Sequence, residues 1–138
     1  MRNLLRILLG LAGLFFTYLG LAFLFAPEQQ GASLGLAAAG SLGRSTLRAD
    51  MTAFFVLAGG GFLYAAIRQR ALALAVPMAL FGIAFFGRLV GILADGATHD
   101  VLLPLTVEAL MVALGAFGAA WLARKPVKPE AVEPVEPL

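Results

Sequence analysis

The sequence predicts an all-α fold, an integral membrane four-helix antiparallel bundle with both termini in the cytoplasm. Hydrophobic residues make up 61% of the 138 residues and charged residues only 13%, against roughly 25% in ordinary soluble domains. The mean hydropathy is +0.92. Four apolar segments each approach the roughly 20 residues that a helix needs to cross the hydrocarbon core of a bilayer. These observations exclude a soluble globular domain.

The four segments define one membrane domain, residues 1–124. The chain starts with the basic stretch MRNLLR followed by an apolar run and so resembles a secretory signal, but the apolar stretch is too long for one. Pro27 follows Ala26, the best small-residue cleavage site, and would block cleavage there, so we expect a retained helix. The predicted spanning helices cover residues 4–26, 47–67, 71–93 and 101–122.

Two of the connections between the predicted helices are short enough to form tight hairpins, and one, residues 27–46, is long. The links RQR and DGATHD are so short that the helices on either side of each must be antiparallel neighbours. The connection 27–46 is rich in Gly, Ala and Ser, and two interpretations stay open: an interfacial or re-entrant half-helix, or a flexible loop. Residues 125–138 carry four prolines among charges and predict a disordered Pro/Glu-rich cytoplasmic tail.

The positions of Lys and Arg predict the orientation, because cytoplasmic loops carry an excess of these residues. Two basic residues, Arg44 and Arg48, lie on the side of the long connection, and seven lie on the other side. We therefore expect a multi-pass protein of the plasma (inner) membrane with cytoplasmic N- and C-termini. The seven are Arg2, Arg6, Arg68, Arg70, Arg124, Lys125 and Lys128.

Two opposite charges lie inside the predicted membrane helices, Arg88 in the third and Glu108 in the fourth. An ionised side chain near the middle of a membrane helix costs about 2.5–3.5 kcal/mol on insertion scales, so each needs a partner or a purpose. Both lie about one heptad from the helix end that faces the same short loop, at a depth of roughly 9 Å. The two side chains can therefore meet.

Four further polar side chains fall in the same outer half of the predicted bundle. Tyr18 lies about two turns inside the first helix, and Arg48 and Asp50 lie near the start of the second. Asp95 lies one heptad beyond Arg88, on nearly the same helix face. The sequence thus predicts an outer charge cluster, which consists of Arg88, Glu108, Asp50, Arg48, Asp95 and Tyr18.

Three interpretations of this cluster stay open. In the first, Arg88 and Glu108 form a structural ion pair, and the protein is a non-enzymatic structural or partner subunit. In the second, the protein binds or transports a small molecule or lipid in an outward-facing pocket, where Arg88 binds an anionic or carbonyl group and Glu108 or Asp50 accepts a proton. In the third, it is a membrane enzyme that acts on a lipid or quinone.

The sequence assigns no catalytic residues, no metal and no cofactor. It holds no HExxH, no nucleophile elbow and no P-loop. Without cysteine there is no disulfide and no cysteine zinc site, and His99 is a solitary histidine in a loop. Basic residues lie at segment ends rather than on one face, which argues against nucleic acid. The expected partners are membrane lipids and either another membrane protein or a second copy of the chain.

Two groups of glycines predict close helix contacts. Gly59, Gly60 and Gly61 lie in the middle of the second predicted helix, where they let another helix approach or permit a kink. Gly87 and Gly91 form a small-xxx-small face on the third helix, which we expect to pack within the bundle rather than in a dimer.

The order of these features resembles a known family. A helix ending in FLFAP, a small-residue connection, the segment RADMTAFFVLAGGGFL, the segment GRLVGILADG and a helix with VEAL follow one another. This order is similar to that of the small bacterial four-helix membrane proteins catalogued as domain of unknown function 4345, distantly similar to the DoxX-like membrane proteins. The resemblance covers about residues 5–123. It implies a four-helix fold in the plasma membrane and no established activity.

Overall fold

The structure, a computed structural model, describes residues 2–96 and 98–124. The tail predicted over 125–138 lies outside the described residues. All regular elements in the described part are helical, in agreement with the predicted all-α class. In chain order they are α1 (Arg2–Phe25), α2 (Pro27–Ser33), α3 (Gly40–Thr46), the π-helix η1 (Leu47–Met51), α4 (Thr52–Arg68), the 3-10 helix η2 (Ala71–Leu74), α5 (Ala75–Asp95) and α6 (His99–Ala123).

Four helical stretches are long and apolar enough to cross a membrane, as the sequence predicts. The second stretch starts earlier than expected, at Gly40 instead of residue 47, because α3, η1 and α4 follow one another without a break. The four stretches are Asn3–Phe25, Gly40–Arg68, Ala71–Asp95 and His99–Ala123.

The long connection is partly helical, so the flexible-loop interpretation is wrong for residues 27–33 and 40–46. Pro27 begins α2, where its missing N–H and fixed φ suit the first helical turn. Gly31 of α2 lies close to η1: a Cβ there would lie 3.1 Å from Leu47 Cδ1. The connection therefore folds back onto the start of the second spanning stretch.

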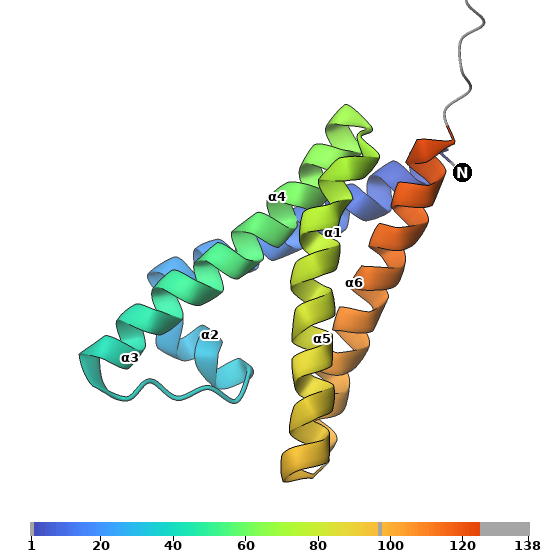
Figure 1. Cartoon of the computed structure of the whole chain (residues 1–138). Coiled ribbons are helices and arrows are strands. Elements are labelled where there is room, and N and C mark those ends of the chain that lie inside the picture. Colours follow the sequence, from blue (N-terminus) through green and yellow to red (C-terminus); the bar gives the residue numbers. More distant parts are fainter. Residues whose placement is uncertain (1, 97, 125–138) are drawn as a thin grey trace, which may run out of the picture.

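Two antiparallel hairpins make up the molecule, α1 with α4 and α5 with α6 (Figure 1). The hairpins meet near the turn between α4 and α5, where η2 contacts both α4 and α6. From there they diverge toward α2, α3 and the α5–α6 connection (Figure 1). We call the first region the closed end of the bundle and the second the open end.

Glycines let α1 and α4 approach closely. A Cβ on Gly59 would lie 2.7 Å from the carbonyl oxygen of Gly13, and one on Gly20 would lie 2.9 Å from the amide nitrogen of Val56. Such separations leave no room for a side chain, so the helices pack backbone to backbone, as small-residue interfaces in membranes do. Gly61 faces α5 instead, since its Cβ would lie 2.6 Å from Pro77 Cδ. The expected close approach at this glycine run therefore involves two different neighbours.

The other predicted glycine face does not pack within the bundle. Nothing lies within 4 Å of a Cβ built on Gly87 or on Gly91. The expectation that these two glycines contact a helix of the same chain is wrong. The reason is the divergence of the hairpins, which leaves the later half of α5 without a neighbour on that face.

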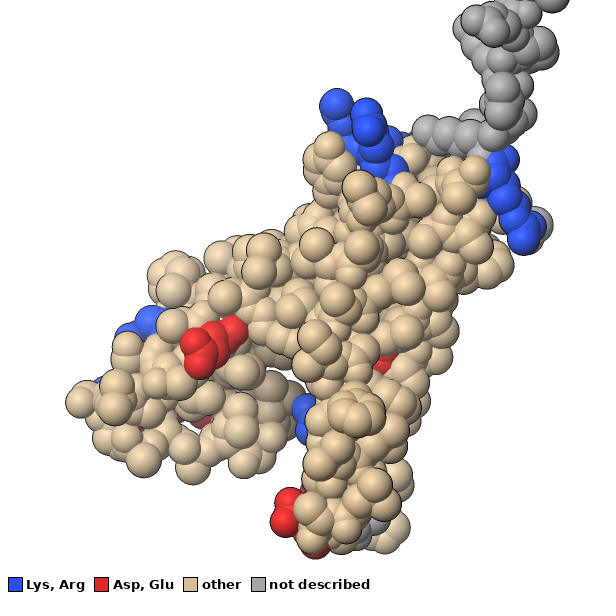
Figure 2. Space-filling view, viewed as in Figure 1, with Lys and Arg blue, Asp and Glu red and all other residues tan. Residues whose placement is uncertain are grey.

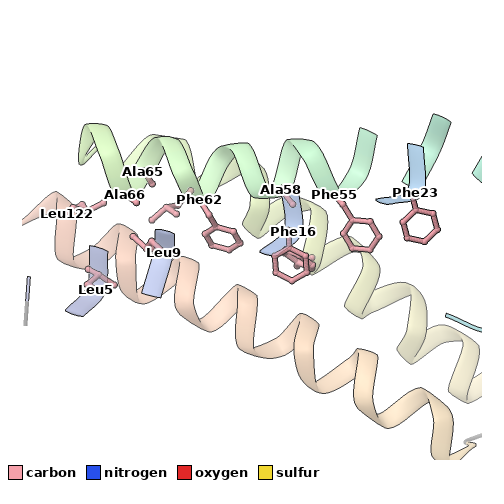
Figure 3. Close-up of a cluster of buried hydrophobic side chains, with 12 residues drawn as sticks. Leu5, Leu9, Phe16, Phe23, Phe55, Ala58, Phe62, Ala65, Ala66 and Leu122 are labelled. Carbon is pink, nitrogen blue, oxygen red and sulfur yellow. The ribbon is translucent and has the colours of Figure 1, made fainter. Parts of the chain in front are cut away.

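A core of buried hydrophobic side chains, several of them aromatic, lies within the bundle (Figure 3). The ring centroid of Phe81, on α5, lies 4.7 Å from that of Phe16 on α1 and 5.6 Å from that of Phe54 on α4. The ring centroid of Phe62, on α4, lies 6.3 Å from that of Phe81. These distances suit favourable aromatic pairs. Most of the core thus lies in the α1–α4 hairpin and the first half of α5, and Leu74 of η2 and Leu122 of α6 complete it at the closed end.

The turn after α4 is fixed by local hydrogen bonds. Gln69 adopts the left-handed conformation, with φ of 54°. Its amide Nε2 donates to the carbonyl oxygen of Ala66 at 2.8 Å, which satisfies a carbonyl that the helix end leaves free. The Arg6 Nε–H donates to the same oxygen at 3.3 Å and so ties the start of α1 to the end of α4.

Candidate functional site

Arg88 and Glu108 are in direct contact across the α5–α6 hairpin. The Nε–H of Arg88 donates to Oε1 of Glu108 at 2.7 Å, a charge-assisted hydrogen bond of the short, strong kind. Arg88 lies about 10 Å from the Asp95 end of α5, and Glu108 lies about 13 Å from the His99 end of α6. Matching depth on two antiparallel neighbours is what lets the side chains meet.

The two partners differ in exposure. The side chain of Arg88 is 33% exposed, whereas that of Glu108 is 7% exposed. The second carboxylate oxygen, Oε2 of Glu108, is buried and has no hydrogen-bond partner in the described part of the chain. A buried polar oxygen without a donor is unfavourable and rare in folded proteins. The site therefore combines a buried acceptor without a donor, Oε2 of Glu108, with the partly exposed guanidinium of Arg88.

The pair lies in the half of the α5–α6 hairpin that diverges from the rest of the bundle. The buried residues of α5 are Pro77 and Phe81, both in its first half. In α6, Glu108 is the buried residue nearest to the open end, ahead of Gly115. Figure 2 shows a hollow between the α2–α3 end of the molecule and the α5–α6 hairpin, with a basic side chain at its edge.

Arg48 binds the backbone of α1. Its Nε–H donates to the carbonyl oxygen of Leu24 at 2.9 Å. Leu24 lies in the last turn of α1, where carbonyls lack helical partners and a cation is favoured by the helix dipole. Arg48 and Asp50 belong to η1, a π-helical turn of a kind often found at functional sites.

The structure does not link the remaining members of the predicted outer charge cluster to the ion pair. Asp50, Asp95 and Tyr18 are exposed, with Tyr18 at 71%. None of the three makes a side-chain hydrogen bond or ion pair with another described residue. Of the six predicted residues, the structure thus brings Arg88 and Glu108 together and gives Arg48 a separate backbone partner.

A second ion pair escaped the sequence reasoning. Arg44 of α3 donates from Nε to Oε1 of Glu28 in α2 at 2.8 Å. Both side chains are more than half exposed, so the pair is worth little on its own. The sequence offered no pattern for it, since the two residues lie on separate short helices whose packing the spacing does not define.

The remaining chemistry of the described residues is limited. No group of three or more His, Cys, Asp or Glu among residues 2–96 and 98–124 can hold a metal ion. The Arg88–Glu108 pair offers guanidinium N–H donors and a carboxylate acceptor within one site. Chemically, such a set can pair with a group that carries both a hydrogen-bond donor and an acidic or carbonyl group.

Four long apolar helices in two antiparallel hairpins define a multi-pass membrane protein with an ion pair inside it. The chain belongs to the family described as Domain of unknown function (DUF4345), whose model matches residues 4–120. The matched region includes both members of the ion pair. No curated protein and no solved structure matches the chain.

Proposed function

We propose that this protein binds an amphipathic small molecule or lipid between its two hairpins, with Arg88 and Glu108 as the recognition residues. The observation that supports this proposal is the buried Oε2 of Glu108, which lacks a donor in the described residues. A pair that served packing alone would be expected to satisfy both carboxylate oxygens, because a half-satisfied buried carboxylate costs stability.

Ligand binding on this proposal requires Arg88 to move. Glu108 is buried, whereas Arg88 is one third exposed and has a flexible side chain. A ligand whose N–H or O–H groups reach the carboxylate donates to Oε2 of Glu108 and takes the place of Arg88 there, and its acidic or carbonyl group then meets the displaced guanidinium. Once the ligand is bound, each charged group again has a hydrogen-bond partner, which limits the cost of an ion inside the membrane.

The test is the melting temperature of the purified protein in detergent for wild type, Arg88→Leu, Glu108→Leu and the double variant. Each protein is measured with two matched pairs of additives. Phosphatidylethanolamine and phosphatidylcholine with the same acyl chains differ in the hydrogen-bond donors of the headgroup. A ubiquinol and its ubiquinone differ in whether the ring oxygens donate.

If the protein binds such a ligand, an additive with hydrogen-bond donors should raise the melting temperature of the wild type more than its donor-free counterpart does. The double variant should fold, but its melting temperature should not rise with either additive. If no additive shifts the wild type while the double variant regains the stability lost by the single variants, the binding proposal is wrong.

A second candidate function is a structural or partner subunit, and the weak burial of α5 and α6 favours it. Only 11% of the most apolar window of the third spanning stretch is buried within the chain, against 33% for the second. Large apolar side chains such as Ile83 and Leu93 are 73% and 87% exposed. Under this proposal the ion pair only locks α5 to α6, and another membrane protein or a second copy covers part of this surface. Cross-linking in intact membranes tests it, since a subunit yields a defined complex.

We also propose a location in the plasma membrane with both termini in the cytoplasm. The support is the excess of basic residues at the closed end, which follows the positive-inside rule. The members of this group whose side chains the structure describes are Arg6, Arg68, Arg70 and Arg124.

A further inference from the structure

A groove lies at the closed end of the bundle, between the start of α1 and the end of α4. It is open to the surroundings and has a volume of about 540 Å³. Its apolar walls include Ile7 and Ile67, which are 55% and 68% exposed. Asn3 and Arg6 supply the polar side. The groove thus pairs one polar edge with apolar walls on two membrane helices.

The guanidinium of Arg6 is held at the edge of this groove. Its Nε–H donates to the carbonyl oxygen of Ala66 at 3.3 Å, which fixes one side of the planar group. The two Nη atoms make no hydrogen bond or ion pair with any other described residue. Guanidinium N–H donors arranged as a fork match two oxygens of a phosphate. Arg6 is therefore anchored and still able to bind an anion.

Charge at the closed end has a single sign among the described side chains. Arg6, Arg68, Arg70 and Arg124 lie there, whereas the described acidic residues lie in α2, η1, the last turn of α5 and the first half of α6. Of the described residues, Figure 2 shows basic side chains and no acidic ones at this end, whereas both kinds appear toward the open end. The groove therefore has the charge complementary to an anionic headgroup at the membrane surface, where basic pockets between helices bind acidic lipids.

We propose that this groove is a binding site for an anionic phospholipid. The phosphate lies on the Nη groups of Arg6, and an acyl chain runs along Ile7 and Ile67 into the bilayer. The site is separate from the Arg88–Glu108 pair and does not depend on the function proposed for that pair. The occupant is a lipid rather than a free phosphate because the apolar walls adjoin the hydrocarbon region.

The test measures binding of phosphatidylglycerol with palmitoyl and oleoyl chains to the full chain in detergent, by native mass spectrometry and by thermal unfolding. Phosphatidylcholine with the same chains is the neutral comparison. Arg6→Gln should lower the apparent affinity for phosphatidylglycerol about fivefold, because one basic residue near an anionic headgroup contributes about 1 kcal/mol. Arg124→Gln removes an equal charge at the same end outside the groove and should leave most of the affinity.

Three outcomes would overturn the site. The first is an equal loss in Arg124→Gln and Arg6→Gln, which would mean diffuse attraction to the closed end. The second is equal binding of the two lipids. The third is equal stabilisation by glycerol 3-phosphate, which carries the phosphate without acyl chains. If Arg6→Gln fails to fold, Ile67→Glu decides: it places a carboxylate in the groove without removing Arg6, and retained phosphatidylglycerol binding in that variant would contradict the proposal.

Discussion

Gly59 of α4 lies against the backbone of Thr17 in α1, so closely that a Cβ on the glycine would lie 2.5 Å from the threonine amide nitrogen. Backbone atoms cannot turn aside as the end of a flexible side chain can. The separation between α1 and α4 is therefore set at this point by the missing side chain. Gly60, the next residue, has nothing within 4 Å of its Cβ position.

Gly59→Ala should therefore destabilise the protein, by about 1–3 kcal/mol, the usual cost of overpacking a well-packed interface. Gly60→Ala is the matched control, since it adds the same methyl group to open space on the same helix. Alanine favours helix over glycine by up to about 1 kcal/mol, so this variant should be neutral or more stable. Equilibrium unfolding in mixed micelles measures both, and equal effects would contradict the close contact.

The ion pair should respond unequally to loss of its two members. Arg88→Leu leaves Glu108 buried without a counter-ion, and we expect a loss of about 3–5 kcal/mol in the free energy of unfolding. Glu108→Leu leaves Arg88, whose one-third exposure lets the guanidinium reach polar surroundings, so the loss should be smaller. Unfolding in mixed micelles gives both values. A larger loss in Glu108→Leu would mean that Arg88 depends on the pair more than its exposure indicates.

Arg48 should stabilise the end of α1. Arg48→Gln removes the Nε–H that donates to Leu24, and a loss of about 0.5–1.5 kcal/mol is expected for one hydrogen bond. Arg44→Gln is the control, because it breaks an exposed pair worth about 0–1 kcal/mol. Hydrogen exchange at the last turn of α1 should rise in Arg48→Gln alone. Unchanged exchange there would show that the bond does not hold this helix end.

Replacing Phe81 should destabilise the packing of α5 against the α1–α4 hairpin. Phe81→Ala leaves a cavity beside Phe16 and Phe54. In lipid the transfer part of the cost is missing, so we expect up to about 3 kcal/mol, below the 3–5 kcal/mol usual for water-soluble cores. Phe86→Ala is the control, since Phe86 is 67% exposed and should cost little. Thermal unfolding compares the two, and equal losses would place the joint elsewhere.

The membrane topology can be measured by labelling single introduced cysteines. No native cysteine has to be removed first, because the chain has none. Asn3→Cys marks the closed end and Thr98→Cys marks the α5–α6 connection, and both positions are exposed. With cytoplasmic termini, a membrane-impermeant maleimide added to intact cells should label the cysteine at 98 and spare the one at 3. The reverse pattern would place the termini outside.

Helix positions and the contact between Arg88 and Glu108 were within reach of the sequence. Apolar length marked the four spanning stretches, and equal distance from one short connection put the two charges at the same depth. The sequence left open whether the connection 27–46 is helical or a flexible loop, since that segment has little apolar periodicity. The partner of Arg48 was also hidden, because it is a backbone carbonyl, and a backbone acceptor leaves no pattern in side-chain types.

Tyr18 shows where depth alone misleads. The face of α1 that meets α4 carries Gly13, Thr17 and Gly20, and Tyr18 is rotated about 100° from Thr17 on a helix of 3.6 residues per turn. Its depth suited the predicted cluster, but its direction did not. Distance along a helix and direction around it are separate quantities, and the spacing of small residues gives only the second.

The two hairpins meet near the turn at residues 69–71 and diverge from there. Any rotation of the α5–α6 hairpin about this turn, the pivot, would therefore displace its far end the most. The stretch Ala71–Asp95 has 25 residues and is about 37 Å long at about 1.5 Å per residue. A rotation of about 10° at the pivot would move its far end by about 6 Å and Phe81 by about 2.6 Å. The width of the open end beside Arg88 and Glu108 would therefore change by more than the shift of the aromatic contacts at Phe81.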